Sequence, residues 1–78
     1  KRGQIAQLTI LVNSVQAIED ILKKYNQNGI AIQNINVNTD ESDYPIVTTD
    51  VRLGKAITKS ELVVVLSKLE DVREVYHG

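Results

Sequence analysis

The sequence predicts an α+β domain in which a four-stranded antiparallel sheet carries two helices on one face. Three observations predict this fold. Apolar residues alternate with polar residues in four segments, two other segments have apolar residues at helical spacing, and the order strand–helix–strand occurs twice in 78 residues. Because such crossovers are right-handed, the order βαββαβ gives a ferredoxin-like sheet with residues 4–12 and 46–53 as central strands and residues 30–38 and 71–77 as edges.

The first strand is expected at residues 4–12, QIAQLTILV, where apolar residues alternate onto one face: Leu8, Ile10 and Val12. The helix that follows has apolar residues at i, i+3, i+4 and i+7: Ile18, Ile21, Leu22 and Tyr25. Asn13 and Gln16 have the spacing of a capping box, so Asn13 is expected to be the N-cap. Asn28 and Gly29 are expected to end the helix, because glycine readily adopts the left-handed conformation found there.

Residues 30–38, IAIQNINVN, predict an edge strand that contains a β-bulge. The apolar residues before and after Gln33–Asn34 have opposite phases of the alternation, so a bulge there would bring all of them to the core face. Three amide side chains would then point away from the core: Asn34, Asn36 and Asn38. A bulge and a polar row both favour an edge position.

The second half repeats the pattern after a turn at residues 39–45, TDESDYP. A strand is expected at residues 46–53, with Val47, Val51 and Leu53 facing the core and Thr48, Asp50 and Arg52 facing out. Thr58 and Glu61 form a T-x-x-E capping box, which predicts a second helix with its apolar face at Leu62, Val65, Leu66 and Leu69. Residues 71–77 form the last expected strand, with Val72 and Val75.

The composition indicates one small soluble domain without a catalytic centre. Nine basic and ten acidic residues are well mixed and give a net charge of −1, which offers no electrostatic reason to bind nucleic acid. The absence of cysteine excludes disulfides, thiolate zinc sites and cysteine nucleophiles, and it fits a cytoplasmic location. His77, the one histidine, stands beside the last residue, where no desolvated pocket is expected. We therefore expect no enzyme and no cofactor.

Two further features bear on partners. The strands at residues 4–12 and 46–53 lack the aromatic residues on which RNA-recognition modules stack bases. Asp40, Glu41 and Asp43 lack the spacing of a calcium loop, so they are candidates only for a weak surface cation site, with ordinary turn chemistry as the alternative. The chain contains no methionine, and we expect residues 1–78 to be a single domain of a longer polypeptide.

The stretch Ile10 to Val37, followed by a second half of the same kind, resembles an ACT domain over nearly the whole chain. The resemblance implies a regulatory module, often one that binds an amino acid at the turn between the first strand and the first helix. The family motif D-x-x-G-x-L corresponds to NSVQAI at residues 13–18, which makes Asn13, Ser14 and Gln16 the implied ligand-binding residues. Gln16 stands in place of the glycine that lets a ligand approach the backbone.

The later family pattern G-I-N-I corresponds to GIAI at residues 29–32, so a polar residue is lost there too. An ACT-like domain with both changes is similar to the C-terminal cytoplasmic domain of the MgtC/SapB family of bacterial inner-membrane proteins, which is linked to growth at low magnesium and to survival inside host cells. This resemblance implies a non-catalytic regulatory or assembly domain at the cytoplasmic side of the inner membrane. The alternative is an amino-acid-sensing ACT domain of a cytosolic enzyme or of a (p)ppGpp synthetase.

The outer face of the sheet is the expected partner surface. Asn34, Asn36 and Asn38 either face water and keep the edge from aggregating or hydrogen-bond a partner. Ile5, Leu11 and Ile46 are expected on the same face, where an apolar patch would require a cover. That cover would be a second copy in a homodimer or another domain of the parent protein.

Overall fold

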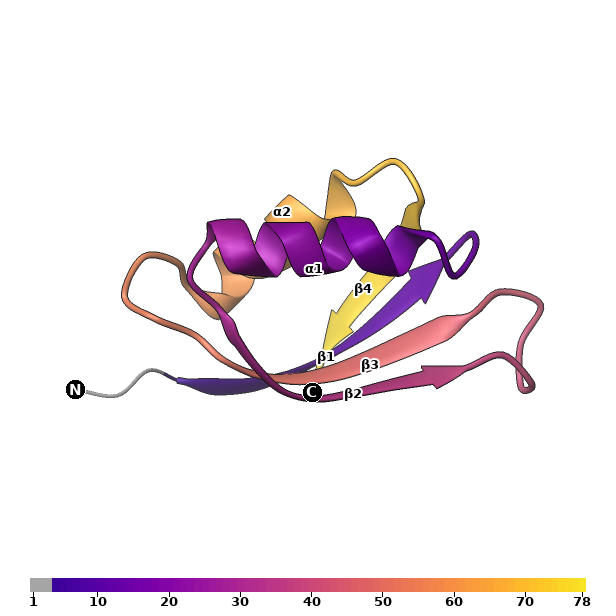
Figure 1. Ribbon diagram of the computed structural model, residues 1–78, viewed down its shortest axis with the longest axis horizontal. Coiled ribbons are helices and arrows are strands. Elements are labelled where there is room, and N and C mark those ends of the chain that lie inside the picture. Colours follow the sequence, from indigo (N-terminus) through magenta and orange to yellow (C-terminus); the bar gives the residue numbers. More distant parts are fainter. Residues whose placement is uncertain (1–3) are drawn as a thin grey trace.

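The computed structural model describes residues 4–78 and confirms the expected order of elements (Figure 1). The four strands pair antiparallel in the order β2-β3-β1-β4, so the first and third strands are central, and both helices cover one face of the sheet. The fold is therefore ferredoxin-like. The elements are β1 (Ile5–Val12), α1 (Ala17–Gln27), β2 (Ala31–Asn38), β3 (Ile46–Arg52), α2 (Lys59–Ser67) and β4 (Val72–His77).

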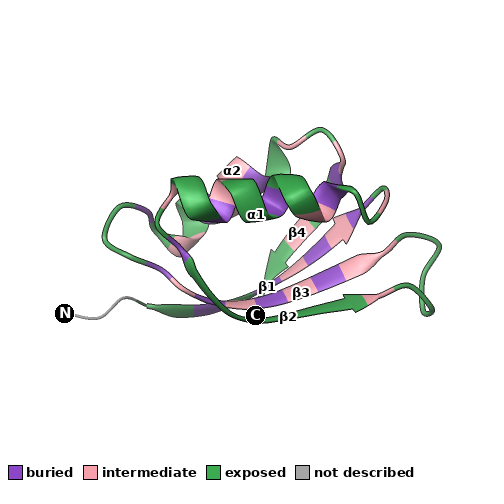
Figure 2. Cartoon of the chain, viewed as in Figure 1, coloured by how far each residue is buried: buried purple, intermediate pink, exposed green. Residues whose placement is uncertain are grey.

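The core lies between the central strands and the two helices, as the buried bands on β1 and β3 in Figure 2 show. The predicted alternation is confirmed in both strands, because every second residue is buried against the helices. Each fully buried aliphatic side chain contributes roughly 1.5–3 kcal/mol to folding before entropy is counted. The largest fully buried apolar side chains are Leu8, Ile10, Val12, Ile21, Tyr25, Val47, Val51, Leu53, Leu62 and Leu66.

Two of the three predicted helix ends are confirmed. Thr58 Oγ1 accepts a hydrogen bond from the Glu61 N–H (3.1 Å), and Glu61 Oε1 accepts one from the Thr58 N–H (2.8 Å), so the capping box of α2 is complete. Gly29 ends the turn after α1 with a φ of 67°, in the left-handed region. The helix α2 itself ends at Ser67, so Leu69, expected on that helix, lies beyond it and still packs partly buried against the core.

The prediction that Asn13 caps α1 is wrong. The N-cap position is Gln16, which has helical φ and ψ angles of −62° and −24° and makes no side-chain capping bond. An extra turn separates β1 from α1, with the Ala17 N–H donating to the Ser14 carbonyl. The side chain of Asn13 is therefore three residues too early to reach the free N–H groups of the helix, which lie in its first turn.

The predicted bulge in β2 is confirmed. The pairing of β2 with β3 shifts register between Ile32 and Asn34, so that Ile32 lies opposite Val51 and Ile35 lies opposite Thr49. Because Val51 and Thr49 face the helices, the apolar residues of β2 lie on the helix side of the sheet on both sides of the bulge. The asparagines of β2 consequently lie on the outer face, as expected.

Candidate functional site

The turn between β1 and α1 is already occupied by side chains of the chain itself. Asn13 Oδ1 accepts a hydrogen bond from Arg73 Nη1 at 3.1 Å, and the Asn13 N–H donates to the Asp71 carbonyl at 2.8 Å. The Arg73 guanidinium also lies over the ring of Tyr44, 4.0 Å from its centroid. Ser14 is partly buried, and Gln16 is exposed. Arg73 thus links the first turn to the loop before β3, a contact that no motif in the sequence indicated.

The outer face of the sheet pairs its own polar groups. Asp50 on β3 accepts a hydrogen bond from Gln7 Nε2 on β1 at 3.0 Å and one from Asn34 Nδ2 on β2 at 3.4 Å. These three side chains form one row across three neighbouring strands. Asn36 lies next in the strand, opposite Thr48. Asn34 is thus engaged by a neighbour within the sheet, as solvated surface residues often are.

The expected apolar patch on this face is not continuous. Ile5 is paired with Arg52, whereas Leu11 is paired with Ile46. The six-residue separation between Ile5 and Leu11 corresponds to about 20 Å along a strand. Gln7 and Thr9 of β1 lie between them, with the exposed Tyr76 of β4 opposite Thr9. Ile5 is thus separated from Leu11 and Ile46 along β1, and a partner contact through this face stays a prediction.

The acidic turn after β2 is organised by Asn38. Its Oδ1 accepts hydrogen bonds from the N–H groups of Asp40 (2.9 Å) and Glu41 (3.2 Å), the pattern of an Asx turn. Within residues 4–78, no three histidine, aspartate or glutamate side chains converge as a metal site would require. Asp40, Glu41 and Asp43 are thus placed along one turn without being brought together around a common point.

The helix side of β2 exposes an apolar row that the helices do not cover. Ile32, Ile35 and Val37 are exposed by 39%, 40% and 39%, although the matching residues of β1 and β3 are fully buried. Figure 2 shows β2 as an almost wholly exposed strand beside the buried bands of β3. The four-stranded sheet is wider than the layer formed by the two helices. The part of the sheet that the helices leave uncovered is β2.

The free edge of β2 lacks the usual protection of edge strands. Its eight residues, AIQNINVN, include no charged residue and no proline. The other edge strand, β4, is shorter and carries charged side chains, Arg73 and Glu74 among them. Edge strands usually avoid pairing with other chains through charges, prolines and short length. By these criteria β4 is protected, while β2 relies on its bulge alone.

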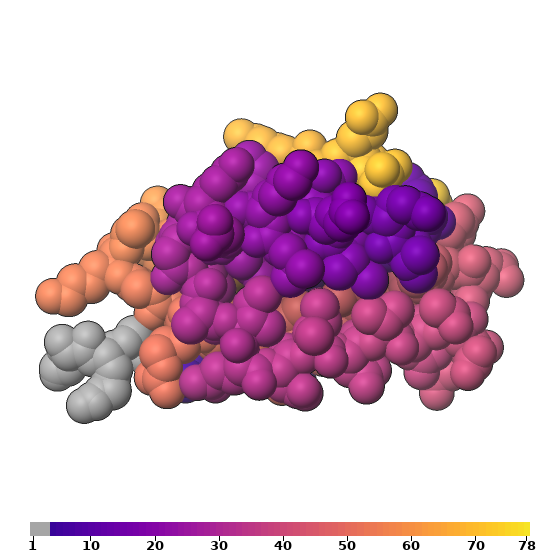
Figure 3. Space-filling model, viewed as in Figure 1, coloured from indigo at the N-terminus to yellow at the C-terminus, as the bar shows by residue number. Residues whose placement is uncertain are grey.

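One flank of α1 continues the apolar surface of β2. The helix lies on the β2 side of the sheet, with α2 on the β4 side (Figure 1). Its buried row is Ala17, Ile21 and Tyr25, and the right-handed turn of the helix places Ile18 and Leu22 on the flank toward β2. Ile18 is partly buried, and Leu22 is 38% exposed. Figure 3 shows this face, with α1 above and β2 below.

We define the β2–α1 surface as the apolar row of β2 with this flank of α1: Ile18, Leu22, Ile32, Ile35 and Val37. The alternation in the sequence predicts Ile32, Ile35 and Val37 on the core face, and they do lie on the helix side of the sheet. They are nevertheless exposed, because the sequence does not show how much of the sheet the helices cover. Within residues 4–78 no helix has the length and apolar character needed to cross a bilayer.

Comparison with known proteins supports the fold and leaves the family open. No protein-family model matches the chain, and no curated protein matches it. Among solved structures, the chain is similar to the solution structure of the C-terminal domain of the MgtC protein from Mycobacterium tuberculosis, with a TM-score of 0.72 and 18% sequence identity. The match covers 97% of this chain and 86% of that chain. The likeness at this identity shows a shared fold, and the expected structural resemblance to an MgtC C-terminal domain is confirmed at that level.

Proposed function

We propose that the chain is a non-catalytic assembly domain of an MgtC-type membrane protein, held on the cytoplasmic side, and that it works by pairing with a second copy through the β2–α1 surface. The observation that carries this proposal is the uncharged edge strand with its exposed apolar row, Ile32, Ile35 and Val37. The fold likeness to the MgtC domain supports the type of parent protein.

Pairing of two β2 edges would give partners both to the free backbone groups of β2 and to the exposed apolar residues of the β2–α1 surface. Antiparallel pairing supplies hydrogen-bond partners to the outward backbone groups of β2 and extends the sheet to eight strands. The same movement brings the two α1 helices together over the seam, so that the apolar rows of both copies are covered. An edge strand without charge can pair with its own copy without placing like charges opposite each other.

The composition of the β2–α1 surface suits a copy of the same chain as the occupant. A two-fold axis between the β2 edges makes the two α1 helices antiparallel, with the apolar flank of each facing the other. At helical spacing, Asp20 and Lys24 fall on the opposite flank of α1, so they do not enter this seam.

The contact of Arg73 with Asn13 argues against the alternative role as an amino-acid sensor. A ligand at residues 13–16 would compete with that hydrogen bond, and the exposed Gln16 replaces the glycine of the family motif. Titration with the amino acids, followed by amide chemical shifts of residues 12–18, separates the two functions. Saturable shifts there would favour the sensor.

Sedimentation equilibrium over a range of concentrations tests the pairing. The unmodified chain should show a concentration-dependent dimer. Ile35→Lys should weaken the dimer at least tenfold, about 1.4 kcal/mol, because it places two like charges near the two-fold axis in an apolar seam.

The matched control is Ile5→Lys, which puts the same charge on an exposed isoleucine of the outer face (51%, against 40% for Ile35). It should leave the dimer unchanged. A strict monomer at millimolar concentration contradicts the proposal. Loss of the dimer in Ile5→Lys with retention in Ile35→Lys would move the interface to the outer face of the sheet.

A further inference from the structure

The charges of the folded chain are separated along its long axis. The molecule measures 40 × 20 × 18 Å, and successive elements run in opposite directions along the longest dimension. The end of α1, the end of β3 and the start of α2 therefore meet at one end of the molecule. We call this the basic end, because four cations lie there: Lys24, Arg52, Lys55 and Lys59.

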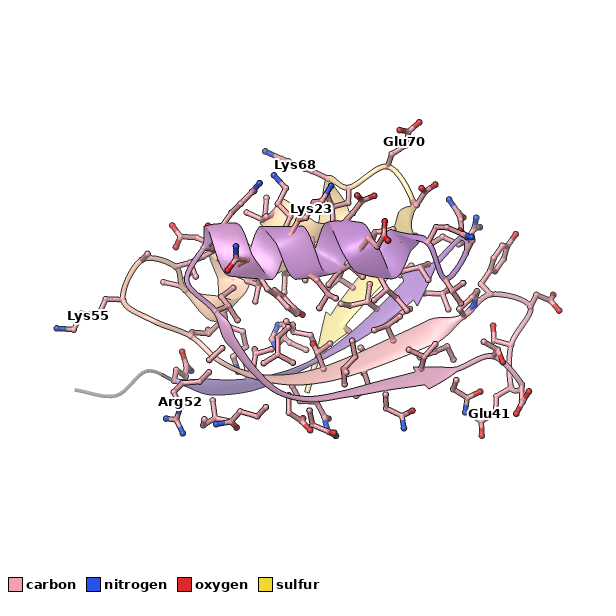
Figure 4. All side chains as sticks on the ribbon, in the orientation of Figure 1. Lys23, Glu41, Arg52, Lys55, Lys68 and Glu70 are labelled. Carbon is pink, nitrogen blue, oxygen red and sulfur yellow. The ribbon has the colours of Figure 1, made fainter. Side chains whose placement is uncertain are left out.

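The opposite end is acidic. The start of α1, the turn between β2 and β3, and the turn before β4 meet there, and they contribute Glu19, Asp20, Asp40, Glu41, Asp43, Glu70 and Asp71. Arg73 is a cation at the same end, where it contacts Asn13 and the Tyr44 ring. Figure 4 shows Arg52 and Lys55 at one end, with Glu41 and Glu70 at the other. The near-neutral net charge of the sequence therefore conceals a strong separation, which only the fold produces.

Two carboxylates also lie toward the basic end, and both accept hydrogen bonds from neutral donors. Glu61 accepts the hydrogen bond of the Thr58 N–H in the capping box of α2. Asp50 accepts hydrogen bonds from Gln7 and Asn34 on the outer face of the sheet. The lysines of this end belong to three segments: Lys24 to α1, Lys55 to the loop after β3 and Lys59 to the start of α2.

An open apolar cavity of about 470 Å³ lies at the same end, between the end of α1 and the first turns of α2. Ala56, Ile57, Val64 and Val65 supply its apolar walls, and Val64 is 52% exposed. Lys55 and Lys59 directly precede two of the lining residues, Ala56 and Ser60, in the sequence. Cations thus stand beside exposed apolar surface.

We propose that the basic end is a docking surface for an anionic lipid bilayer. A bilayer fits this end better than a peptide does, because cations from separate segments, gathered at one end of an elongated molecule, can contact one flat anionic surface together. The apolar walls beside the lysines suit the boundary between headgroups and acyl chains. The chain would stand end-on, with its acidic end in water.

Screening makes this orientation favourable despite the net charge. The Debye length is about 8 Å at physiological ionic strength, so charges farther away are largely screened. The acidic end lies at the far end of a 40 Å axis and therefore contributes little repulsion. Each lysine close to an anionic leaflet contributes an attraction that corresponds to about a fivefold change in binding.

This inference uses a surface other than the β2–α1 surface and does not depend on pairing of two copies. Co-sedimentation of the 78-residue chain with vesicles tests it. The chain should bind vesicles of mixed phosphatidylglycerol and phosphatidylcholine, should not bind phosphatidylcholine alone, and should be released at 1 M salt, where the Debye length is about 3 Å.

Variants identify the surface. The double variant Lys55→Gln with Lys59→Gln should bind roughly twenty-fivefold more weakly, about fivefold for each lysine. Lys68→Gln removes one positive charge at the other end of α2 and should bind as the unmodified chain does, whereas Lys55→Gln alone should bind about fivefold more weakly. Circular dichroism checks that all variants are folded.

Equal binding to neutral vesicles, or equal weakening by Lys68→Gln, would overturn the proposal. Binding to a soluble polyglutamate peptide that weakens in the double variant, with no vesicle binding, would also overturn it and assign the basic end to an acidic protein partner. A monomeric chain that still binds vesicles would contradict only the pairing of two copies.

Discussion

The hydroxyl oxygens of Tyr25 and Thr49 lie 2.7 Å apart in the middle of the core, and both side chains are fully buried. Tyr25 belongs to α1 and Thr49 to β3, so this hydrogen bond joins the helix layer to the sheet. Thr49 is the buried polar residue that the described chain places among aliphatic neighbours. A directional bond in an otherwise non-directional core helps to fix the position of α1 over the strands.

Thr49→Val should lower the free energy of unfolding by about 1–3 kcal/mol, because it leaves the Tyr25 hydroxyl buried without a partner. Adding Tyr25→Phe should recover part of this loss, since the double variant has no unsatisfied hydroxyl. Urea unfolding of both single variants and the double variant forms a thermodynamic cycle. Strictly additive effects would show that the two hydroxyls do not interact.

Stability should decline at high pH through the ionisation of Tyr25. Burial raises the pKa of Tyr25 above its ordinary value of 10.0, and the hydrogen bond with Thr49 offsets only part of that shift. The folded chain therefore keeps this proton at pH values where the unfolded chain releases it. The associated stability is complete below pH 10 and is lost as the pH rises from there through the folded-state pKa.

Comparison with Tyr25→Phe isolates this effect from other groups that ionise in the same range. Above pH 10 the unmodified chain should lose up to about 1.4 kcal/mol more per pH unit than the variant does. Thermal or urea unfolding from pH 8 to 11 measures the difference. Parallel pH profiles for the two chains would contradict the prediction.

Gly29→Ala should destabilise the chain by about 1–2 kcal/mol through backbone strain alone. The φ of Gly29 is 67°, and a Cβ built there would meet no atom within 4 Å. Gly54→Ala is the matched control, because its Cβ would make an ordinary contact of 3.6 Å with the Gly29 carbonyl oxygen and its φ is not in the left-handed region. Urea unfolding should show a clearly larger loss for Gly29→Ala, and equal losses would contradict the strain.

Arg73→Gln should cost only about 0.5–1.5 kcal/mol, because the contacts of Arg73 with Asn13 and the Tyr44 ring are exposed. The more informative measurement for this variant is the chemical shift of individual amide groups. Amide shifts should change at both Asn13 and Tyr44, which are far apart in the sequence, while Lys68→Gln should change neither. Shifts confined to the neighbours of Arg73 in β4 would show that the link is not populated.

The sequence predicted the elements wherever local chemistry decides them. The T-x-x-E pattern at Thr58 produced a complete capping box, and Gly29 produced the left-handed turn. The opposite phases of the isoleucines around Gln33 located the bulge in β2. These features depend on residues within a few positions of one another, so a single sequence is enough to reveal them.

The first turn contains a contact that no local sequence pattern predicts. Asn13 has the chemistry of an N-cap, yet its amide oxygen is bound by Arg73, sixty residues later. The hydroxyl bond of Tyr25 with Thr49 was not predicted for the same reason, because its two partners come from different layers. Contacts between distant segments depend on how the layers are packed, and no local pattern encodes them.

By itself, the sequence determined the order of six elements and the face that each would bury, because alternation and helical spacing follow from the geometry of single strands and helices. Only the tertiary structure decided which apolar residues stay exposed and where the charges gather. The helices are too few to cover β2, and the antiparallel alternation of elements brings lysines from three segments to one end of the molecule.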